Sequence, residues 1–179
     1  MPTKNSLKEY IKNGYYHIYN RGVEKRTIFQ DEQDSKVFLS YLKEYLEPPP
    51  PPETLIKEFK VEGGIFIGID KPINNYYEKI DLVAYCLMPN HFHLLVKQND
   101  ERSLEFFMRS VGTRYTIYFN KRYNRVGHLF QGTYRAVYVQ SAEQLLHLSR
   151  YIHLNPVKET PSEVAWKKVL KESYSSYQE

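Results

Sequence analysis

Two histidines, His91 and His93, are the first residues of this sequence whose types and spacing could do chemistry. They open the apolar run 92–97 (FHLLVK), and the apolar run 81–87 (DLVAYCL) precedes them, a pairing typical of a β-hairpin. Because side chains alternate faces along a strand, both imidazoles would point one way and Phe92 the other. Such a pair can ligate a metal, although an isolated His-x-His is more often two polar residues at a strand end. Within so apolar a hairpin the histidines need a partner, which a metal or a phosphate would supply.

A second candidate group lies further along the chain, where His147, Tyr151 and Asn155 are spaced four residues apart. The residues at 141–144 (SAEQ) form a capping-box pattern and predict a helix, so the three side chains share one helix face. The tyrosine could simply pack against the domain, and an asparagine before Pro156 could simply end the helix. The pattern alone leaves these alternatives open.

A third candidate is the stretch 106–134, which carries cations and aromatic rings and no Asp or Glu. Cations can follow the phosphates of a single nucleic-acid strand while rings stack on its bases. The alternative is a solvated basic helix face above core aromatics. The cations are Arg109, Arg114, Lys121, Arg122 and Arg125.

The elements that must position these residues follow from the apolar periodicity. Strands are predicted at 15–21, 81–87, 92–97 and 134–140, and helices at 31–46, 102–120 and from 141 to about 155. The order is β-α-(insert)-β-β-α-β-α, and the central hairpin requires antiparallel pairing. The sequence therefore predicts an α+β fold in which helices cover one face of a small antiparallel sheet.

A Pro-rich insertion at about 47–79 interrupts this order. Residues 48–52 are all proline, which excludes a helix there and predicts a stiff spacer. We interpret it as a linker rather than a docking motif, with a short hairpin near Gly63 and Gly64. The rest of the 179 residues is predicted to be one domain.

The composition sets limits on the class of protein. Hydrophobic residues make up 41% and the net charge is +4, which fits a globular chain with a polyanionic partner without requiring one. Cys86 is the single cysteine, so an internal disulfide is excluded and a cytoplasmic setting is the default expectation. No apolar segment has the pattern of a signal peptide or the ~18 residues needed to span a membrane.

Four blocks in order, YHIYNRG, AYCLMPNHFHLLV, FNKRYNRVGHLFQGTYRA and LSRYIHLNPVK, resemble the REP-associated tyrosine transposases. These belong to the insertion-sequence-200-like family of single-tyrosine HUH transposases. The resemblance covers roughly residues 14–177, and the combination of blocks is far more specific than His-x-His alone. Two features depart from the family pattern: the Pro-rich insertion is longer than usual, and the sequence stops soon after Tyr177 where members usually continue.

The resemblance implies a ferredoxin-like or RRM-like antiparallel sheet and assigns roles to four residues. His91 and His93 would be the metal ligands, Tyr151 the catalytic nucleophile and Asn155 the third ligand, through its amide. Imidazole and oxygen ligands suit Mg²⁺ or Mn²⁺, and two histidines lean towards Mn²⁺.

The resemblance also implies the reaction and the partner. Tyr151 would attack single-stranded DNA and form a 5′-phosphotyrosine, which a second 3′-hydroxyl could reverse. The DNA would carry a hairpin of the repetitive-palindrome type, recognised through the basic surface and the N-terminal region. We expect Arg114, Lys121, Arg122 and Arg125 to contact the DNA backbone, and the protein to act as a monomer or a homodimer.

Three alternatives differ in function class. A non-catalytic RRM-like module would bind a single strand of DNA or RNA without metal dependence or a covalent adduct. A replication initiator or relaxase with the same chemistry usually carries extra domains, for which 179 residues leave little room. A metallohydrolase of the amidohydrolase type would need a barrel of about 250 residues, which the length excludes.

Overall fold

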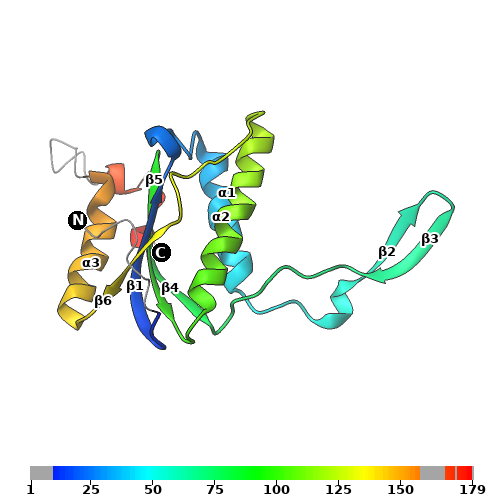
Figure 1. Ribbon diagram of the computed structural model, residues 1–179, viewed down its shortest axis with the longest axis horizontal. Helices are drawn as coiled ribbons and strands as arrows, with labels where there is room; N and C mark the ends of the chain where they lie inside the picture. Colours follow the sequence, from blue (N-terminus) through cyan, green and yellow to red (C-terminus); the bar gives the residue numbers. More distant parts are fainter. Residues whose placement is uncertain (1–9, 158–167, 172, 179) are drawn as a thin grey trace.

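The computed structural model describes residues 10–157, 168–171 and 173–178. Its centre is a four-stranded antiparallel sheet in the order β4-β5-β1-β6 (Figure 1). The strands are β1 (Gly14–Arg21), β4 (Ile80–Met88), β5 (His91–Gln98) and β6 (Arg135–Val139). This confirms the predicted α+β class and element order. Among the described residues, no helix is long and apolar enough to cross a membrane.

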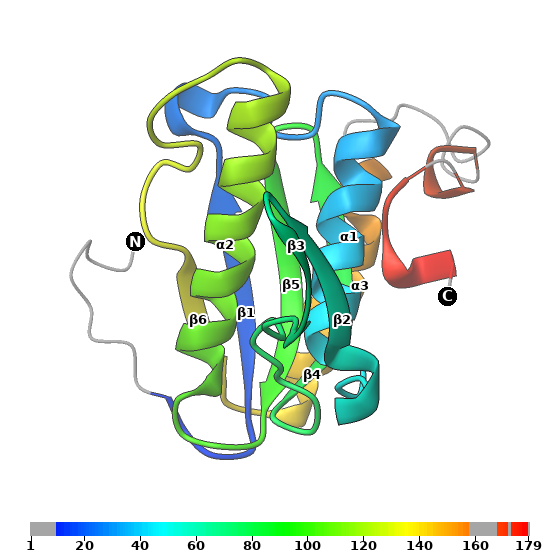
Figure 2. The same ribbon diagram turned by 90° about the vertical axis from the view of Figure 1, so that its right-hand side faces the viewer.

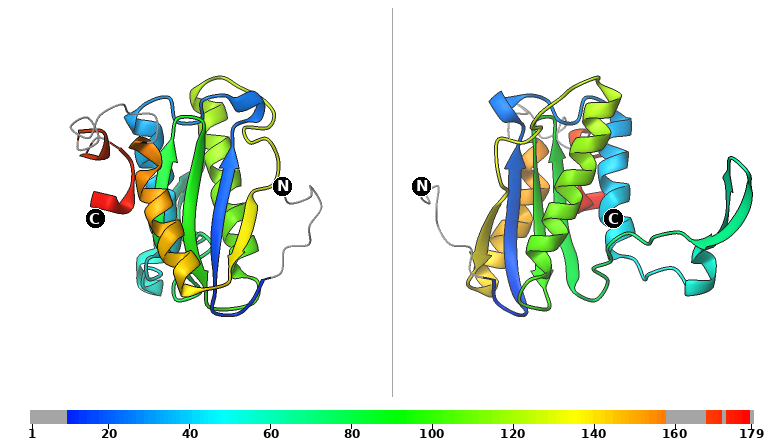
Figure 3. Two further views of the ribbon diagram at one scale, coloured as in Figure 1. Left: turned by 90° about the vertical axis from the view of Figure 1, so that its left-hand side faces the viewer. Right: turned by 45° about the vertical axis from the view of Figure 1, so that its right-hand side comes forward.

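Helices lie on both sides of this sheet (Figures 1 and 3). The helices α1 (Glu32–Leu46) and α2 (Ser103–Arg122) cover one face together, as predicted. The helix α3 (Ala142–Leu154) packs against the opposite face, where Figure 3 shows it lying across the strands. The expectation that the helices cover a single face was therefore wrong for α3, because the odd-numbered residues of β5 and their neighbours form a second apolar surface that this helix buries. The domain therefore has three layers, with the sheet in the middle.

Strand β5 separates two apolar clusters because its side chains alternate. Phe92, Leu94 and Val96 are buried in the larger cluster, beneath α1 and α2. Leu95 is buried in the smaller cluster beneath α3, with Ile152 among its neighbours. The face that α3 covers is thus the face that must also carry the odd-numbered residues of β5, His91 and His93.

The outer edge of β4 is covered by the C-terminal residues 173–178. The backbone N–H of Leu87 donates to the carbonyl of Tyr174 at 2.9 Å, and the N–H of Tyr85 donates to Ser176 Oγ at 2.9 Å. These bonds satisfy backbone groups that an edge strand would otherwise leave open to another chain.

The N-termini of two helices are capped by side chains, as their sequences indicate. Asp31 Oδ1 accepts from the N–H of Asp34 at 3.1 Å in α1, and Ser141 Oγ accepts from the N–H of Gln144 at 3.1 Å in α3. The capping box at α3 differs from the usual form in one bond. Gln144 Oε1 accepts from the N–H of Gln140, at 2.8 Å, one residue before the cap.

A buried carboxylate joins α1 to the end of α2. Asp34 has no exposed surface, and Arg122 Nη1 donates to its Oδ1 at 2.6 Å. Tyr118 donates to the same oxygen at 3.0 Å, while Tyr123 donates to Oδ2 at 2.9 Å. Burial, together with the hydrogen bond to Asp34, raises the pKa of Tyr123 to about 12. Asp34 is therefore fully enclosed by donors, with the Arg122 guanidinium as the balancing charge.

The Pro-rich insertion extends from the sheet as an arm (Figures 1 and 2). It holds the short helix η2 (Pro52–Leu55) and a separate hairpin of β2 (Ile56–Val61) and β3 (Gly64–Ile69). The turn uses Gly63 and Gly64, whose φ angles of 108° and 153° are rarely adopted by residues that have a side chain. The predicted hairpin is thus where the glycines indicated, and none of its residues belongs to either apolar cluster.

We expect the arm to contribute little to the stability of the domain. Replacing residues 53–70 by a short Gly-Ser linker should change the melting temperature by no more than about 2 °C, because no core contact is lost. The comparison is Phe92→Ala, which empties a core position and should cost about 3–5 kcal/mol. Loss of cooperative unfolding in the linker variant would contradict this expectation.

Arg122→Ala should lower the urea concentration at the midpoint of unfolding, because Asp34 would stay buried without its balancing charge. The matched control is Lys121→Ala, an exposed neighbour that should change stability by less than about 0.5 kcal/mol. Urea denaturation of both variants measures the difference. Equal stability of the two would mean that Arg122 does not balance Asp34.

Candidate active site

The histidine pair lies at the start of β5, held by the turn before it. The carbonyl of Pro89 accepts from the N–H groups of Ile28 and Phe29 at 2.7 and 3.0 Å, which fixes the β4–β5 turn. The His91 and His93 ring centroids are 5.1 Å apart, with the rings nearly perpendicular. Both imidazoles lie on the α3 face, opposite the buried Phe92, as the alternation predicted.

Each ring contacts a second residue through Nδ1. His93 Nδ1 is 2.9 Å from His17 Nε2, and His91 Nδ1 is 2.6 Å from Asn90 Oδ1. Since the amide oxygen of Asn90 can only accept, His91 carries a proton on Nδ1. Second contacts of this kind fix the orientation of an imidazole and the nitrogen that it offers to a ligand.

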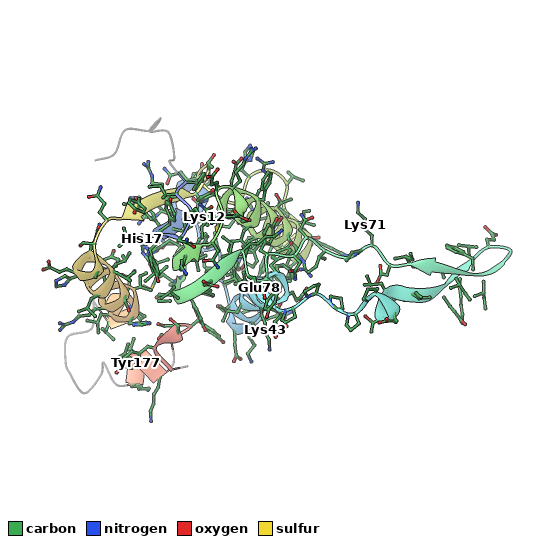
Figure 4. All side chains as sticks on the ribbon, turned by 90° about the horizontal axis from the view of Figure 1, so that it is seen from below. Lys12, His17, Lys43, Lys71, Glu78 and Tyr177 are labelled. Carbon is green, nitrogen blue, oxygen red and sulfur yellow. The ribbon has the colours of Figure 1, made fainter. Side chains whose placement is uncertain are left out.

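His17, on β1, is a site residue that the sequence patterns did not single out. It pairs with Leu95 in the strand register and reaches His93 diagonally, with ring centroids 5.0 Å apart and nearly parallel. Figure 4 labels it between the sheet and α3. Burial lowers the pKa of His17 to about 4, so its imidazole is neutral near pH 7. The sequence feature that could have identified His17 is its odd-numbered position in the predicted strand 15–21, which puts it on the same face as Tyr15 and Tyr19.

Tyr151 comes to the same place from α3. Its ring centroid is 5.7 Å from that of His93 and 6.1 Å from that of His17, edge-on to both. The next residue, Ile152, is fully buried and fixes the rotation of the helix on the sheet, while Tyr151 is 41% exposed. The structure thus brings tyrosine and histidines together within one chain, and the tyrosine is accessible to a large substrate.

Asn155 closes α3 and is buried beside β4. It is the C-cap residue of the helix, as its place before Pro156 indicated, and only 8% of its surface is exposed. Among the described residues its side-chain Nδ2 has no hydrogen-bond partner, which is unusual for a buried amide. That nitrogen is a donor, so a metal would be bound through the amide oxygen instead. The described residues contain no group of three His, Cys, Asp or Glu that could hold a metal.

A small open pocket of about 330 Å³ lies beside Tyr151, between α3 and the β1–β6 edge of the sheet. His147, which the spacing put on the same helix face as Tyr151, lines it. A larger groove of about 1240 Å³ lies between α2 and the loop at 127–134. None of the histidines described above, and not Tyr151, lines that groove. Although it is larger, it is therefore not part of the candidate active site.

The four cations expected to contact DNA lie on α2 or just after it, across the sheet from Tyr151. Arg114 is paired with Glu44 at 2.8 Å and lies over the ring of Tyr41, and Arg122 is paired with Asp31 and Asp34. Arg125 donates to Asn120 Oδ1 at 2.9 Å, and Lys121 is exposed. Two of the guanidinium groups therefore already have carboxylate partners. Contact of these four residues with DNA stays a prediction, and residues 1–9 of the N-terminal region lie outside the described structure.

Comparisons with known proteins concern the family model and the fold. The family model described as transposase IS200 like matches residues 71–155, and no curated protein matches the chain. A solved structure of a REP-associated tyrosine transposase bound to a REP hairpin is similar in fold, with a TM-score of 0.60 and 14% identity over 98% of this chain and 84% of that chain. A candidate transposase from Deinococcus radiodurans R1 matches with a TM-score of 0.46 and 14% identity, over 83% of this chain and 95% of that one. The segment that this family model matches, residues 71–155, holds His91, His93, Tyr151 and Asn155.

Proposed function

We propose that this protein is a metal-dependent single-stranded DNA endonuclease and strand transferase of the single-tyrosine HUH type. Tyr151 is the nucleophile and forms a 5′-phosphotyrosine. The observation that carries the proposal is the position of the Tyr151 ring, 5.7 Å from that of His93 in the same chain. A partly exposed tyrosine beside a pair of imidazoles is the arrangement that a covalent attack on a metal-bound phosphate requires.

His91, His93 and Asn155 would hold the metal, Mg²⁺ or Mn²⁺. The residues present fit such an ion by type: two imidazoles share one strand face, and the buried Asn155 side chain carries an amide oxygen. When bound, the ion supplies Lewis-acid polarisation of the scissile phosphate and neutralises charge that develops on it.

His17 positions His93. If His93 ligates through Nε2, its Nδ1 carries the proton and donates to His17 Nε2 across the 2.9 Å contact. His17 can accept that proton only while it is neutral, and its burial favours the neutral form. The two stacked rings thereby turn the His93 Nε2 nitrogen away from β1.

The reaction exchanges one phosphate ester for another. The Tyr151 oxygen loses its proton to water and attacks phosphorus, so that an O–P bond forms while the bond from phosphorus to the 3′-oxygen breaks. The 3′-oxygen takes up a proton and leaves as a hydroxyl. The phosphotyrosine keeps the ester linkage, so a second 3′-hydroxyl can attack it and join two strands without ATP.

The substrate would be single-stranded, because the nucleophile must reach an unpaired backbone. The similar transposase structure is bound to a REP hairpin, which supports a hairpin near the cleaved strand here. Lys121 is the most accessible of the four cations proposed to contact the backbone, since Arg114 and Arg122 serve ion pairs within the domain.

The second candidate function is a non-catalytic module that binds single-stranded nucleic acid on the same fold. It would bind an oligonucleotide without a metal and without an adduct. The convergence of His17, His93 and Tyr151 favours catalysis, because stacking alone would not require imidazoles in contact with each other.

Incubating the protein with a hairpin-bearing oligonucleotide and Mn²⁺ should give a covalent adduct on a denaturing gel. Tyr151→Phe should abolish the adduct, because the attacking oxygen is gone. His91→Ala should slow its formation by at least about 100-fold, because a metal ligand is lost.

The matched control for the tyrosine is Tyr138→Phe, which removes the hydroxyl of another half-exposed tyrosine and should leave the adduct unchanged. An adduct with Tyr151→Phe would refute the assignment of the nucleophile. Normal cleavage by His91→Ala would refute the metal site, and tight binding without any adduct would favour the non-catalytic module.

The buried His17 should make stability depend on pH. Its pKa is about 4 when folded and ~6.5 when unfolded, so below pH 6.5 the unfolded chain binds the extra proton and the folded state loses stability. In the presence of a chelator, the free energy of unfolding should be about 2 kcal/mol lower at pH 5 than at pH 7.5 from this group. His17→Gln should remove that part of the pH dependence, whereas changing the exposed His128 to Gln should not. An unchanged pH dependence in His17→Gln would show that His17 is not the group responsible.

A further inference from the structure

Most residues that line the pocket beside Tyr151 have no role in the proposed reaction. It is formed by Val137 and Val139 of β6, by Gln144, His147 and Leu148 of α3, and by His17 and Tyr151 at one end. Its volume of about 330 Å³ is near the lower limit of small-molecule sites, which suits one nucleobase rather than a folded segment.

Its walls have the chemistry that binds an unstacked base. The two valines and Leu148 are apolar side chains for the faces of a planar ring, and Val139 is almost fully buried. Gln144 and His147 are exposed polar residues from one side of α3, less than one turn apart. An apolar floor with polar groups at its rim holds a base by its faces and recognises it by its edge.

The side-chain amide of Gln144 has a fixed direction. Its Oε1 accepts from the backbone N–H of Gln140 at 2.8 Å. Because a backbone N–H can only donate, the amide oxygen must face Gln140 and the NH₂ group must face away from it. Of the two polar groups of this amide, the NH₂ donor is therefore the one left for an occupant of the pocket that Gln144 lines.

The pocket adjoins the nucleophile, so its occupant is set by the strand that Tyr151 attacks. The base next to the scissile phosphate is tethered to that phosphate through a single sugar. When the scissile phosphorus lies at Tyr151, the two flanking bases lie on opposite sides of the tyrosine, one towards β6 and one away from it. The pocket is on the side towards β6.

We propose that this pocket takes one base flanking the scissile phosphate, and that Gln144 selects a base with a keto oxygen, thymine or guanine. The inference rests on the proposed function of Tyr151 and specifies its substrate. A donor at this place pairs with O4 of thymine or O6 of guanine, whereas cytosine and adenine present an amino group there, which is itself a donor. If the Gln144 NH₂ group faces the amino group of cytosine or adenine, neither donor has an acceptor and both have lost water. Binding of these two bases is therefore weakened.

The test exchanges the donor for an acceptor. Gln144→Glu keeps Oε1 for the N–H of Gln140 and replaces the NH₂ group by a carboxylate oxygen, which accepts from the amino group of cytosine or adenine. Rates of adduct formation are compared for oligonucleotides that differ only by T against C, or G against A, at each of the two flanking positions. At one position the wild type should prefer the keto base, and the variant should shift the keto-to-amino ratio by roughly 10-fold or more towards the amino base. The ratio at the other position should not change.

Gln140→Glu is the matched control, because it adds the same charge to an exposed residue four positions earlier that does not line the pocket. It should leave the base preference as in the wild type. Equal slowing of all oligonucleotides by Gln144→Glu, or unchanged ratios at both positions, would overturn the assignment of Gln144.

A second measurement separates the pocket from the covalent chemistry. Thymidine and deoxycytidine 5′-monophosphates are titrated into wild type and Gln144→Glu while backbone amide signals are followed by NMR. Perturbation of the residues at 137–139 and 144–148, with tighter binding of thymidine monophosphate by the wild type and the reverse by the variant, supports the pocket even if no oligonucleotide forms an adduct. Perturbation only elsewhere in the domain overturns it even if the adduct forms.

Discussion

The alternation of side chains along β5 is the constraint on which the rest of this structure depends. The strand lies inside the sheet, between β4 and β1, with α1 and α2 over one face of the sheet and α3 over the other. Phe92, Leu94 and Val96 complete the larger apolar cluster, and that packing fixes the strand register. A shift by one residue would bury the histidines beneath α1 and α2. The same packing that stabilises the fold therefore holds His91 and His93 on the opposite face.

The site is assembled where three elements with different tasks meet. Strand β5 supplies the imidazoles, β1 supplies His17, and α3 brings Tyr151 down onto both. The rotation of α3 is set by the buried Ile152, so that its neighbour in sequence faces the histidines instead of solvent alone. The positions of His93 and Tyr151 are thus decided by apolar contacts of residues next to them in sequence, such as Phe92 and Ile152.

Sequence patterns predicted what depends on local periodicity. The histidine pair follows from the period of a strand, and the relation of His147 to Tyr151 follows from the period of a helix. His17 was missed because its contact with His93 joins residues 76 positions apart and runs diagonally between strands. The carboxylate partners of Arg114 and Arg122 lie in α1 or at its N-cap, far earlier in the chain. The basic stretch therefore suggested more cations available to bind DNA than remain unpaired with carboxylates in the folded domain. Long-range pairing of this kind has no signature in a single sequence.

The unequal size of the two apolar clusters has a consequence for motion. In the part of the chain that the structure describes, helices α1 and α2 share the larger cluster. Helix α3 contributes the buried Ile152 to the smaller one, which packs there with Ala84, Cys86, Leu95 and Val139 of the sheet. The free energy of local opening follows the apolar contacts that must be given up. Among the described residues, the helix that carries Tyr151 is therefore the layer that can leave the sheet most readily while the rest of the domain stays folded, and the proposed nucleophile would move with it.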